Sequence, residues 1–449
     1  MGENRYKFPL QILLYTLLIL LVFSFSQRRI NFAKFGVKPI DILADIRTKP
    51  SKKKAKFLGA IKPMDSTQAS KPIEINKLPT IPIIEFNEKG KQGGLENFVK
   101  ALIQLKKNKK GKVRIGYFGD SMIEGDLITQ DLRQKFQDYF GGDGVGFVPI
   151  TSVVAAFRQT IRSEVSDNWK EDNFLQKKIG KLLPPSGHSF YAEQNSWASF
   201  ASFPQTHLGV FHQATLWYGP ADSVSSISYL SKASNLLGKQ ALNSLVLAKD
   251  TLFKKIKIEF NTGNTPVYGV SFESNNGVYL DNYSFRGICG TELMKVNRAL
   301  LSGWSQEHPF DLIVLHYGPN LLFKPEQTDF SYYKKQMDKT IKYLKSAFPN
   351  TSILIVSSAD KAYRNNGTYE TAPGVEPLVL VQQELAKENQ CAFWNLYLAM
   401  GGENAMVRFA EEKPILAHQD YTHFNLSGSH WVARRLNAAI MQKYYEASK

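Results

Sequence analysis

A strand, a tight polar turn and a helix follow one another between residues 113 and 140, and this succession restricts the fold more than any other part of the sequence. The apolar run 113–118 predicts a buried strand. Gly119-Asp120-Ser121-Met122 follows directly, and residues 127–140 have helical spacing. A strand-to-helix turn exposes a serine hydroxyl at the end of a sheet, beside the free N–H groups of the helix start. The segment therefore indicates an α/β protein with a candidate nucleophile at Ser121.

The second half of the chain repeats this alternation. Strands are predicted at 310–316, 352–357 and 391–396, and helices at 333–348, 377–388 and 432–444. Continuous apolar strands that alternate with helices are typical of a parallel sheet covered on both faces. Ligands of such sheets lie beyond the carboxyl ends of the strands. Ser121 and the turn at Gly318, which also follows a strand, should therefore lie on the same edge.

Residues 149–276 have a different pattern. Short alternating runs such as 226–230 and 256–260 recur between turn residues, which predicts antiparallel strands. We therefore expect a β-sandwich-like domain inserted into the α/β unit. The first part of that unit then spans residues 95–148, and the second part spans residues 277–449.

The N-terminus predicts a membrane anchor. Residues 8–27 carry no charge and are mostly Leu, Ile, Phe and Val, which is enough to cross a bilayer as one helix. A cleavable signal peptide is the alternative, but the 24–28 stretch is a poor cleavage site. We assign residues 1–30 to the anchor and residues 31–94 to a basic, Pro- and Lys-containing linker. Arg or Lys flanks the span on both sides, so charge alone does not orient it.

The net charge of +16 is concentrated beside this span, because residues 1–60 hold twelve Lys or Arg and three acidic residues. Such a cluster fits attraction to anionic lipid, or a solvated spacer. No zinc-finger spacing or RNA-binding aromatic motif accompanies it, so we expect no nucleic-acid partner. The two cysteines, Cys289 and Cys391, are too few for a disulfide framework. They could pair with each other, although two small buried apolar residues are the preferred interpretation.

Four separated motifs carry the candidate chemistry. They are Gly119-Asp120-Ser121, the glycine run Arg286-Gly287-Ile288-Cys289-Gly290, Gly318-Pro319-Asn320 after a strand, and Asp420-Tyr421-Thr422-His423 ahead of the last helix. In this order and context they resemble the blocks of the SGNH/GDSL hydrolase family. The resemblance implies a flavodoxin-like three-layer fold and a carboxylic ester hydrolase.

The residues themselves support this chemistry. Serine needs an adjacent base, which His423 can supply, and Asp420 can fix the tautomer of its ring. The backbone N–H groups of Ser121 and Gly290 and the amide of Asn320 could together form an oxyanion hole. Asp120 is expected to hold the turn and not to act as the triad acid. This chemistry requires neither a cofactor nor a metal.

A closer likeness suggests the substrate. The run 119–129 and the run 144–148 are similar to the start of bacterial peptidoglycan O-acetylesterases, which carry a β-sandwich at the same place in the chain. Relatives often have His after the serine, where this chain has Met122. The likeness implies an acetylated glycan or peptidoglycan substrate, a single-pass anchor in the bacterial inner membrane and a catalytic domain that faces the periplasm or the cell exterior. A polysaccharide O-acetyltransferase using the same acyl-serine, or a non-catalytic glycan-binding protein, remains the alternative.

The insert could also bind sugars. Seven of its aromatic side chains could stack on pyranose rings or fill the sandwich core, and the core is the more frequent location of such residues. They are Phe190, Tyr191, Trp197, Phe200, Phe203, Trp217 and Tyr218. Among the histidines, His316, His418 and His430 are expected to be structural.

Overall fold

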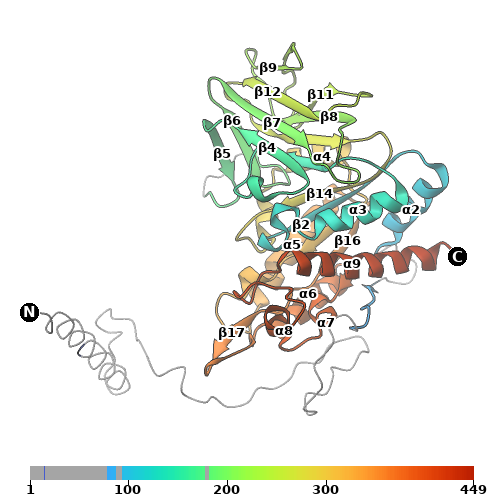
Figure 1. The fold of residues 1–449 in the computed structure, drawn as a ribbon, viewed down its shortest axis with the longest axis vertical. Coiled ribbons are helices and arrows are strands. Elements are labelled where there is room, and N and C mark those ends of the chain that lie inside the picture. The colour runs from blue at the N-terminus through green and yellow to red at the C-terminus, as the bar shows by residue number, and fades with distance from the viewer. Residues whose placement is uncertain (1–14, 16–77, 87–93, 177–181) are drawn as a thin grey trace, which may run out of the picture. The chain divides into compact units, whose positions relative to one another are not determined.

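The computed structural model describes residues 15, 78–86, 94–176 and 182–449 (Figure 1). The predicted anchor at residues 1–30 and most of the linker at 31–94 lie outside these residues. Among the helices that can be described, none combines the length and the apolar character needed to cross a membrane.

A parallel sheet carries the two α/β parts of the chain. Its strands are β2 (Lys112–Gly119), β14 (Gly277–Ser284), β15 (Leu312–His316), β16 (Ser352–Val356) and β19 (Ala392–Trp394). They lie in the order β14-β2-β15-β16-β19, and every neighbouring pair is parallel. In chain order this is 2-1-3-4-5, the flavodoxin-like arrangement. The continuous apolar runs of β15 and β16 are buried throughout, as expected for strands covered on both faces.

Two groups of helices pack on this sheet (Figure 1). The first group is α2 (Glu96–Asn108), α3 (Thr129–Phe140) and α9 (Leu426–Ala447), which contact one another. The second is α4 (Arg298–Glu307), α5 (Ser331–Ala347) and α6 (Val375–Glu388), with α5 contacting both neighbours. Short helices complete the unit: η4 (Ser121–Asp126), η5 (Ala155–Phe157), η6 (Thr291–Lys295), η7 (Pro319–Leu321), α7 (Leu396–Ala399) and α8 (Ala405–Glu411).

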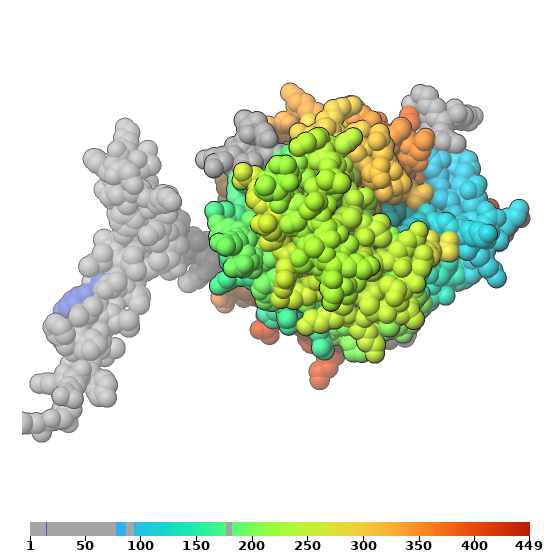
Figure 2. All heavy atoms as spheres, turned by 90° about the horizontal axis from the view of Figure 1, so that it is seen from above, coloured from blue at the N-terminus to red at the C-terminus, as the bar shows by residue number. Residues whose placement is uncertain are grey.

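The insert is a sandwich of two antiparallel sheets around one apolar core. One sheet has the order β10-β9-β12-β7-β4, and its strands are β4 (Ile161–Val165), β7 (Ser196–Ser202), β9 (Ser226–Tyr229), β10 (Lys232–Asn235) and β12 (Lys255–Asn261). The other has the order β11-β8-β13-β6-β5, and its strands are β5 (Trp169–Asn173), β6 (His188–Ala192), β8 (Gln213–Tyr218), β11 (Asn243–Ala248) and β13 (Val267–Glu273). Residues of the insert, green to yellow, dominate the face seen in Figure 2.

The sandwich begins slightly before the predicted boundary at residue 149. Strand β3 (Gly146–Pro149) already pairs with β13 of the sandwich, so that its Val148 lies opposite Val270. The chain returns to the parallel sheet where β14 begins at Gly277.

A buried charge cluster joins the insert to the parallel sheet. Arg114 of β2 donates to Glu273 of β13 through Nη1 and Nη2, at 2.6 and 3.0 Å, and its Nη1 lies 3.5 Å from Asp281 of β14. His308 bonds the same Asp281 carboxylate at 2.7 Å. The side chains of Arg114 and Glu273 are each 7% exposed, so these charges are compensated within the protein.

The predicted boundary of the linker needs correction. The predicted linker extends to residue 94, but β1 (Ile84–Glu85) pairs antiparallel with β19 at the edge of the sheet. Ile81 and Ile83 beside it are also buried, so this part of the predicted linker belongs to the folded unit. Cys289 and Cys391 do not pair, in agreement with the preferred interpretation: both thiols are free, with Cys391 buried and Cys289 partly buried. The hairpin of β17 (Ala362–Asn365) and β18 (Thr368–Thr371) forms a separate two-stranded sheet.

Candidate active site

The Ser121 turn forms because Asp120 closes it. Asp120 is the N-cap of η4, and its Oδ1 accepts the Met122 N–H at 3.0 Å. Gly119 precedes it where a Cβ would lie 2.9 Å from the Ile123 side chain. Burial raises the pKa of Asp120 to about 6, although backbone hydrogen bonds and the nearby His423 oppose this rise. The expectation that Asp120 holds the turn is therefore confirmed.

A second turn presents the imidazole. Asp420 Oδ1 accepts the backbone N–H groups of Thr422 and His423, both at 3.0 Å. Its other oxygen lies 2.6 Å from Nδ1 of the His423 ring. Asn425 then caps α9 by accepting the Gly428 N–H. The local sequence thus fixes both the ring and the start of the last helix.

These two turns meet at the serine. Ser121 Oγ lies 2.8 Å from His423 Nε2, and the chain separation between the two residues is 302. If Nδ1–H donates to Asp420, then Nε2 is free to accept the serine proton. Burial raises the pKa of Asp420, but hydrogen bonds from the His423 backbone and ring and from Thr422 outweigh it and lower that pKa below its usual value. The carboxylate therefore stays ionised and can orient the ring.

Two of the expected oxyanion donors, the Gly290 N–H group and the Asn320 amide, are held in different ways. Gly290 adopts φ +94°, and a Cβ there would lie 2.7 Å from the buried Tyr317 ring, so only glycine fits. The Asn320 amide is already engaged: Nδ2 donates to the Ile288 carbonyl at 2.9 Å and to Asp120 Oδ2 at 3.2 Å. For this amide to stabilise an oxyanion, one of these bonds must be exchanged. The longer bond, to Asp120, is the more easily replaced.

The other histidines have separate roles. His316 is buried, with Nδ1 at 3.1 Å from the Tyr117 hydroxyl, and burial lowers its pKa to about 4. His430 of α9 bonds Asp131 of α3 at 2.6 Å. His418 is exposed at the rim of the Ser121 pocket, and its backbone N–H donates to the His423 carbonyl. His316 and His430 therefore contribute to structure, as expected, whereas His418 lines the pocket beside the proposed base.

The row of Ser121, His423 and Asp420 opens into a pocket of about 310 Å³. Its remaining walls are Met122, Glu124, Gly125, Leu127, Val154, Phe157, Arg286, His418 and Phe424. Sequence reasoning missed the contribution of Glu124 and Arg286, although both lie inside runs that it had singled out. It also missed Val154 and Phe157, which come from the first loop after β3, where no motif or periodicity marks them.

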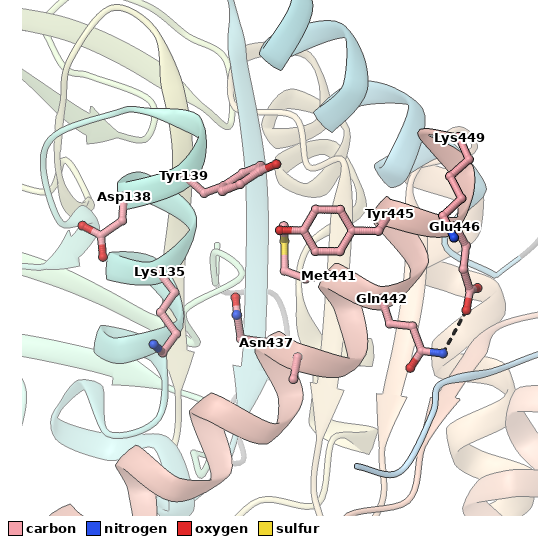
Figure 3. Close-up of a pocket in the computed structure, with 10 residues that line it drawn as sticks. Lys135, Asp138, Tyr139, Asn437, Met441, Gln442, Tyr445, Glu446 and Lys449 are labelled. Carbon is pink, nitrogen blue, oxygen red and sulfur yellow. Dashed lines mark hydrogen bonds between the residues drawn. The ribbon is translucent and has the colours of Figure 1, made fainter.

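Two other hollows of the described residues are larger but lack this chemistry. The groove between α3 and α9 has a volume of about 780 Å³, and Figure 3 shows Tyr139 and Tyr445 on its two walls. A polar groove of about 1480 Å³ lies on the insert and includes Tyr191. Neither groove includes Ser121, Asp420 or His423.

Most of the candidate stacking aromatics belong to the sandwich interior. Phe190, Phe200, Trp217 and Tyr218 are buried, whereas Tyr191, Trp197 and Phe203 are partly exposed. None of the seven lines the Ser121 pocket.

One group within the described residues has the donor atoms of a metal site. Oxygen or nitrogen atoms of Glu273, Asp281 and His308 all lie within 4.8 Å of one another. The Arg114 guanidinium already bonds Glu273 and lies beside Asp281, so a cation of the protein itself neutralises these carboxylates. We therefore interpret the group as structural.

Comparison with known proteins supports the fold. No protein-family model and no curated protein sequence matches the chain. Among solved structures, a peptidoglycan O-acetylesterase matches with a TM-score of 0.66 and 19% identity, over 81% of this chain and 99% of that one. An acetyl xylan esterase (TM-score 0.29, 20% identity, 36% of this chain and 81% of that one) and a lipase/acylhydrolase from Enterococcus faecalis (TM-score 0.28, 17% identity, 37% and 78%) match too weakly to carry an argument. The chain therefore has the fold of a solved peptidoglycan O-acetylesterase.

Proposed function

We propose that this chain is a serine esterase of the SGNH/GDSL type that removes O-acetyl groups from a cell-wall polysaccharide, with peptidoglycan as the preferred substrate. The observation that carries the proposal is the bonded row of Ser121, His423 and Asp420, with contacts of 2.8 and 2.6 Å. The shared fold with a peptidoglycan O-acetylesterase supports the choice of substrate.

The reaction proceeds in two steps. Ser121 Oγ attacks the acetyl carbonyl while His423 Nε2 takes its proton, and a tetrahedral oxyanion forms. Collapse of this intermediate breaks the ester bond, and His423 returns the proton to the departing sugar hydroxyl. Water then attacks the acetyl-serine with His423 again as base, which releases acetate and restores the serine.

Two backbone N–H groups are the proposed donors for the oxyanion. The N–H groups of Ser121 and Gly290 lie at the beginnings of η4 and η6, where short helices leave such groups without an intrahelical acceptor. Asn320 joins them by exchanging its bond to Asp120, so that a hydrogen bond to a charged acceptor is kept throughout. Each donor is expected to contribute about 10²–10³ in rate.

The test compares the full-length chain with Ser121→Ala. We expect the wild type to release acetate from a chromogenic acetyl ester and from O-acetylated peptidoglycan, and the variant to lose about 10⁶ in kcat. Equal acetate release by both proteins would refute the esterase. Formation of new acetylated sugar in place of free acetate would identify a transferase instead.

The same proposal places the protein at the inner membrane of a bacterium, with the catalytic part in the periplasm. The uncharged apolar run at residues 8–27 supports a single-pass anchor, and the basic linker after it would reach toward the glycan. Cell fractionation tests this location. The full-length chain is expected in the membrane fraction, and recovery of uncleaved chain in the soluble fraction would contradict the anchor.

A further inference from the structure

We infer that Phe157 and the Arg286–Glu124 ion pair form a subsite that holds the sugar ring bearing the ester. The inference rests on the proposed function and specifies its substrate class. It begins with Phe157, which is 79% exposed and yet lines the pocket that contains Ser121. A single exposed apolar side chain is ordinary on a protein surface, but this one lies beside the nucleophile.

The position of Phe157 is fixed by its neighbour. Arg158 donates through Nη2 to Asp126 Oδ2 at 3.2 Å and through Nε to the Thr160 hydroxyl at 2.8 Å. Thr160 in turn donates to the same Asp126 oxygen at 2.6 Å. Asp126 is buried and ends η4, a short segment that begins at Ser121 and is kinked at Glu124 and Gly125. One short element therefore carries the nucleophile at its start and the anchor of the Phe157 loop at its end.

Two arginines neutralise Asp126, the buried carboxylate that anchors the Phe157 loop. Arg133 binds Asp126 with two bonds of 2.8 Å. Burial raises the pKa of Asp126, but Arg133 and Arg158 outweigh burial and hold that pKa well below its usual range. The carboxylate is ionised at neutral pH, so the Phe157 loop stays attached to η4 under the conditions of the reaction.

A polar pair occupies the same pocket. Glu124, also in η4, forms an ion pair with Arg286 and is 9% exposed, whereas the Arg286 side chain is 62% exposed. Among the described residues, Arg286 donates to Glu124 through its Nη2 group. Arginine has five N–H donors, so the Nε and Nη1 donors remain to bind hydroxyl oxygens of a ligand. The ion pair with Glu124 holds the guanidinium in place.

An aromatic face beside a fixed donor group fits a pyranose. A sugar ring has an apolar C–H face and a rim of hydroxyl groups, and it can meet both at once. A long acyl chain would meet the charged pair without any hydrogen bond to offset its desolvation, which is unfavourable. The pocket is therefore matched to the alcohol side of the ester and not to an extended fatty acyl group.

The experiment compares Phe157→Ala and Phe157→Trp with Tyr332→Ala in the full-length chain. Tyr332 is a matched control, since this aromatic residue of α5 is 77% exposed and does not line the pocket. We expect Phe157→Ala to raise KM for O-acetylated peptidoglycan fragments at least about fivefold. The loss in kcat/KM should be smaller on chromogenic acetate, which offers no sugar ring. Tyr332→Ala should match the wild type on both substrates, and Phe157→Trp should restore the glycan KM.

Three results would overturn the subsite: an unchanged glycan KM in Phe157→Ala, an equal loss on both substrates, or a selective loss on chromogenic octanoate, which would mark an acyl site. Binding of the same fragments to Ser121→Ala, with and without Phe157→Ala, is measured by calorimetry. The subsite predicts weaker binding in the double variant, and equal binding would refute it even if the chain releases no acetate. Absence of turnover by the wild type on both substrates would refute only the proposed function.

Discussion

Replacing Gly290 by alanine tests the oxyanion geometry most directly. The added Cβ would lie 2.7 and 2.8 Å from two ring carbons of Tyr317 and 3.3 Å from Met337 Cε. Tyr317 is only 2% exposed, so its ring cannot move aside without disturbing the core. The backbone at residue 290 must move instead, and its N–H moves with it.

The cost has two parts. An alanine at a φ of +94° is destabilised by roughly 1–2 kcal/mol because left-handed backbone is strained for any residue with a Cβ. Overpacking against a buried ring adds about 1–3 kcal/mol. We therefore expect Gly290→Ala to lower the free energy of unfolding by about 2–5 kcal/mol, and to lower kcat by about 10²–10³ through the displaced donor.

Gly287→Ala is the matched control. Gly287 lies in the same loop with a φ of +82°, but its Cβ would meet nothing within 4 Å. This variant should lose only about 1–2 kcal/mol and keep the wild-type kcat. Urea unfolding and steady-state hydrolysis of chromogenic acetate measure both quantities, at a temperature where near-UV circular dichroism shows the variants folded. A kcat for Gly290→Ala within about threefold of the wild type would refute the donor role, given the loss of about 10²–10³ expected for one donor.

Further predictions concern four other side chains. Asp420→Asn removes the acceptor that orients the imidazole, so kcat should fall by about 10²–10⁴ with little change in melting temperature; retained activity in a stopped assay would exclude a triad role. Asn320→Ala should lower kcat by about 10²–10³ while KM stays nearly constant, and steady-state kinetics would expose the contrary pattern, a pure KM effect. Asp126→Asn removes the counter-charge of the buried Arg133 and of Arg158, whose side chain is 11% exposed, so urea unfolding should show a loss of about 3–5 kcal/mol; a loss below about 1 kcal/mol would contradict a buried ionic anchor. Burial raises the pKa of Asp360 to about 6 from an ordinary value of 3.8. The folded state therefore binds this proton more tightly, and relative to Asp360→Asn the wild type should lose up to about 3 kcal/mol of stability as pH rises across that window. If the curves of unfolding free energy against pH ran parallel for the wild type and Asp360→Asn, this raised pKa would be disproved.

The α/β unit could be predicted from the sequence because its strands are continuous apolar runs. Four of the five parallel strands follow from that pattern, since a strand covered on both faces leaves no polar alternation. Strand β14 was not predicted, because Asp281 and Asn282 interrupt its apolar run. The meeting of Ser121 with His423 was predicted from the motifs, because a serine nucleophile needs an adjacent base.

Features that depend on distant contacts could not be predicted. Ile81 and Ile83 lie in a short Pro-containing run that resembles a linker, and only the exposed edge of β19 makes it a strand neighbour. The engagement of the Asn320 amide depends on the position of the Ile288 carbonyl, which no local pattern encodes. Phe157 reaches the pocket through the tertiary bond of Arg158 to Asp126, whose partners are 32 residues apart in the chain.

The buried cluster of Arg114, Glu273, Asp281 and His308 limits how the protein can be re-engineered. Glu273 comes from the last strand of the sandwich, whereas the other three residues belong to the α/β unit. Excision of residues 149–276 would remove this glutamate and leave the buried Arg114 guanidinium without its main counter-charge. The sandwich therefore cannot be removed or exchanged by itself. A shortened chain or a chimaera needs either another acidic residue at the position of Glu273 or an apolar residue in place of Arg114.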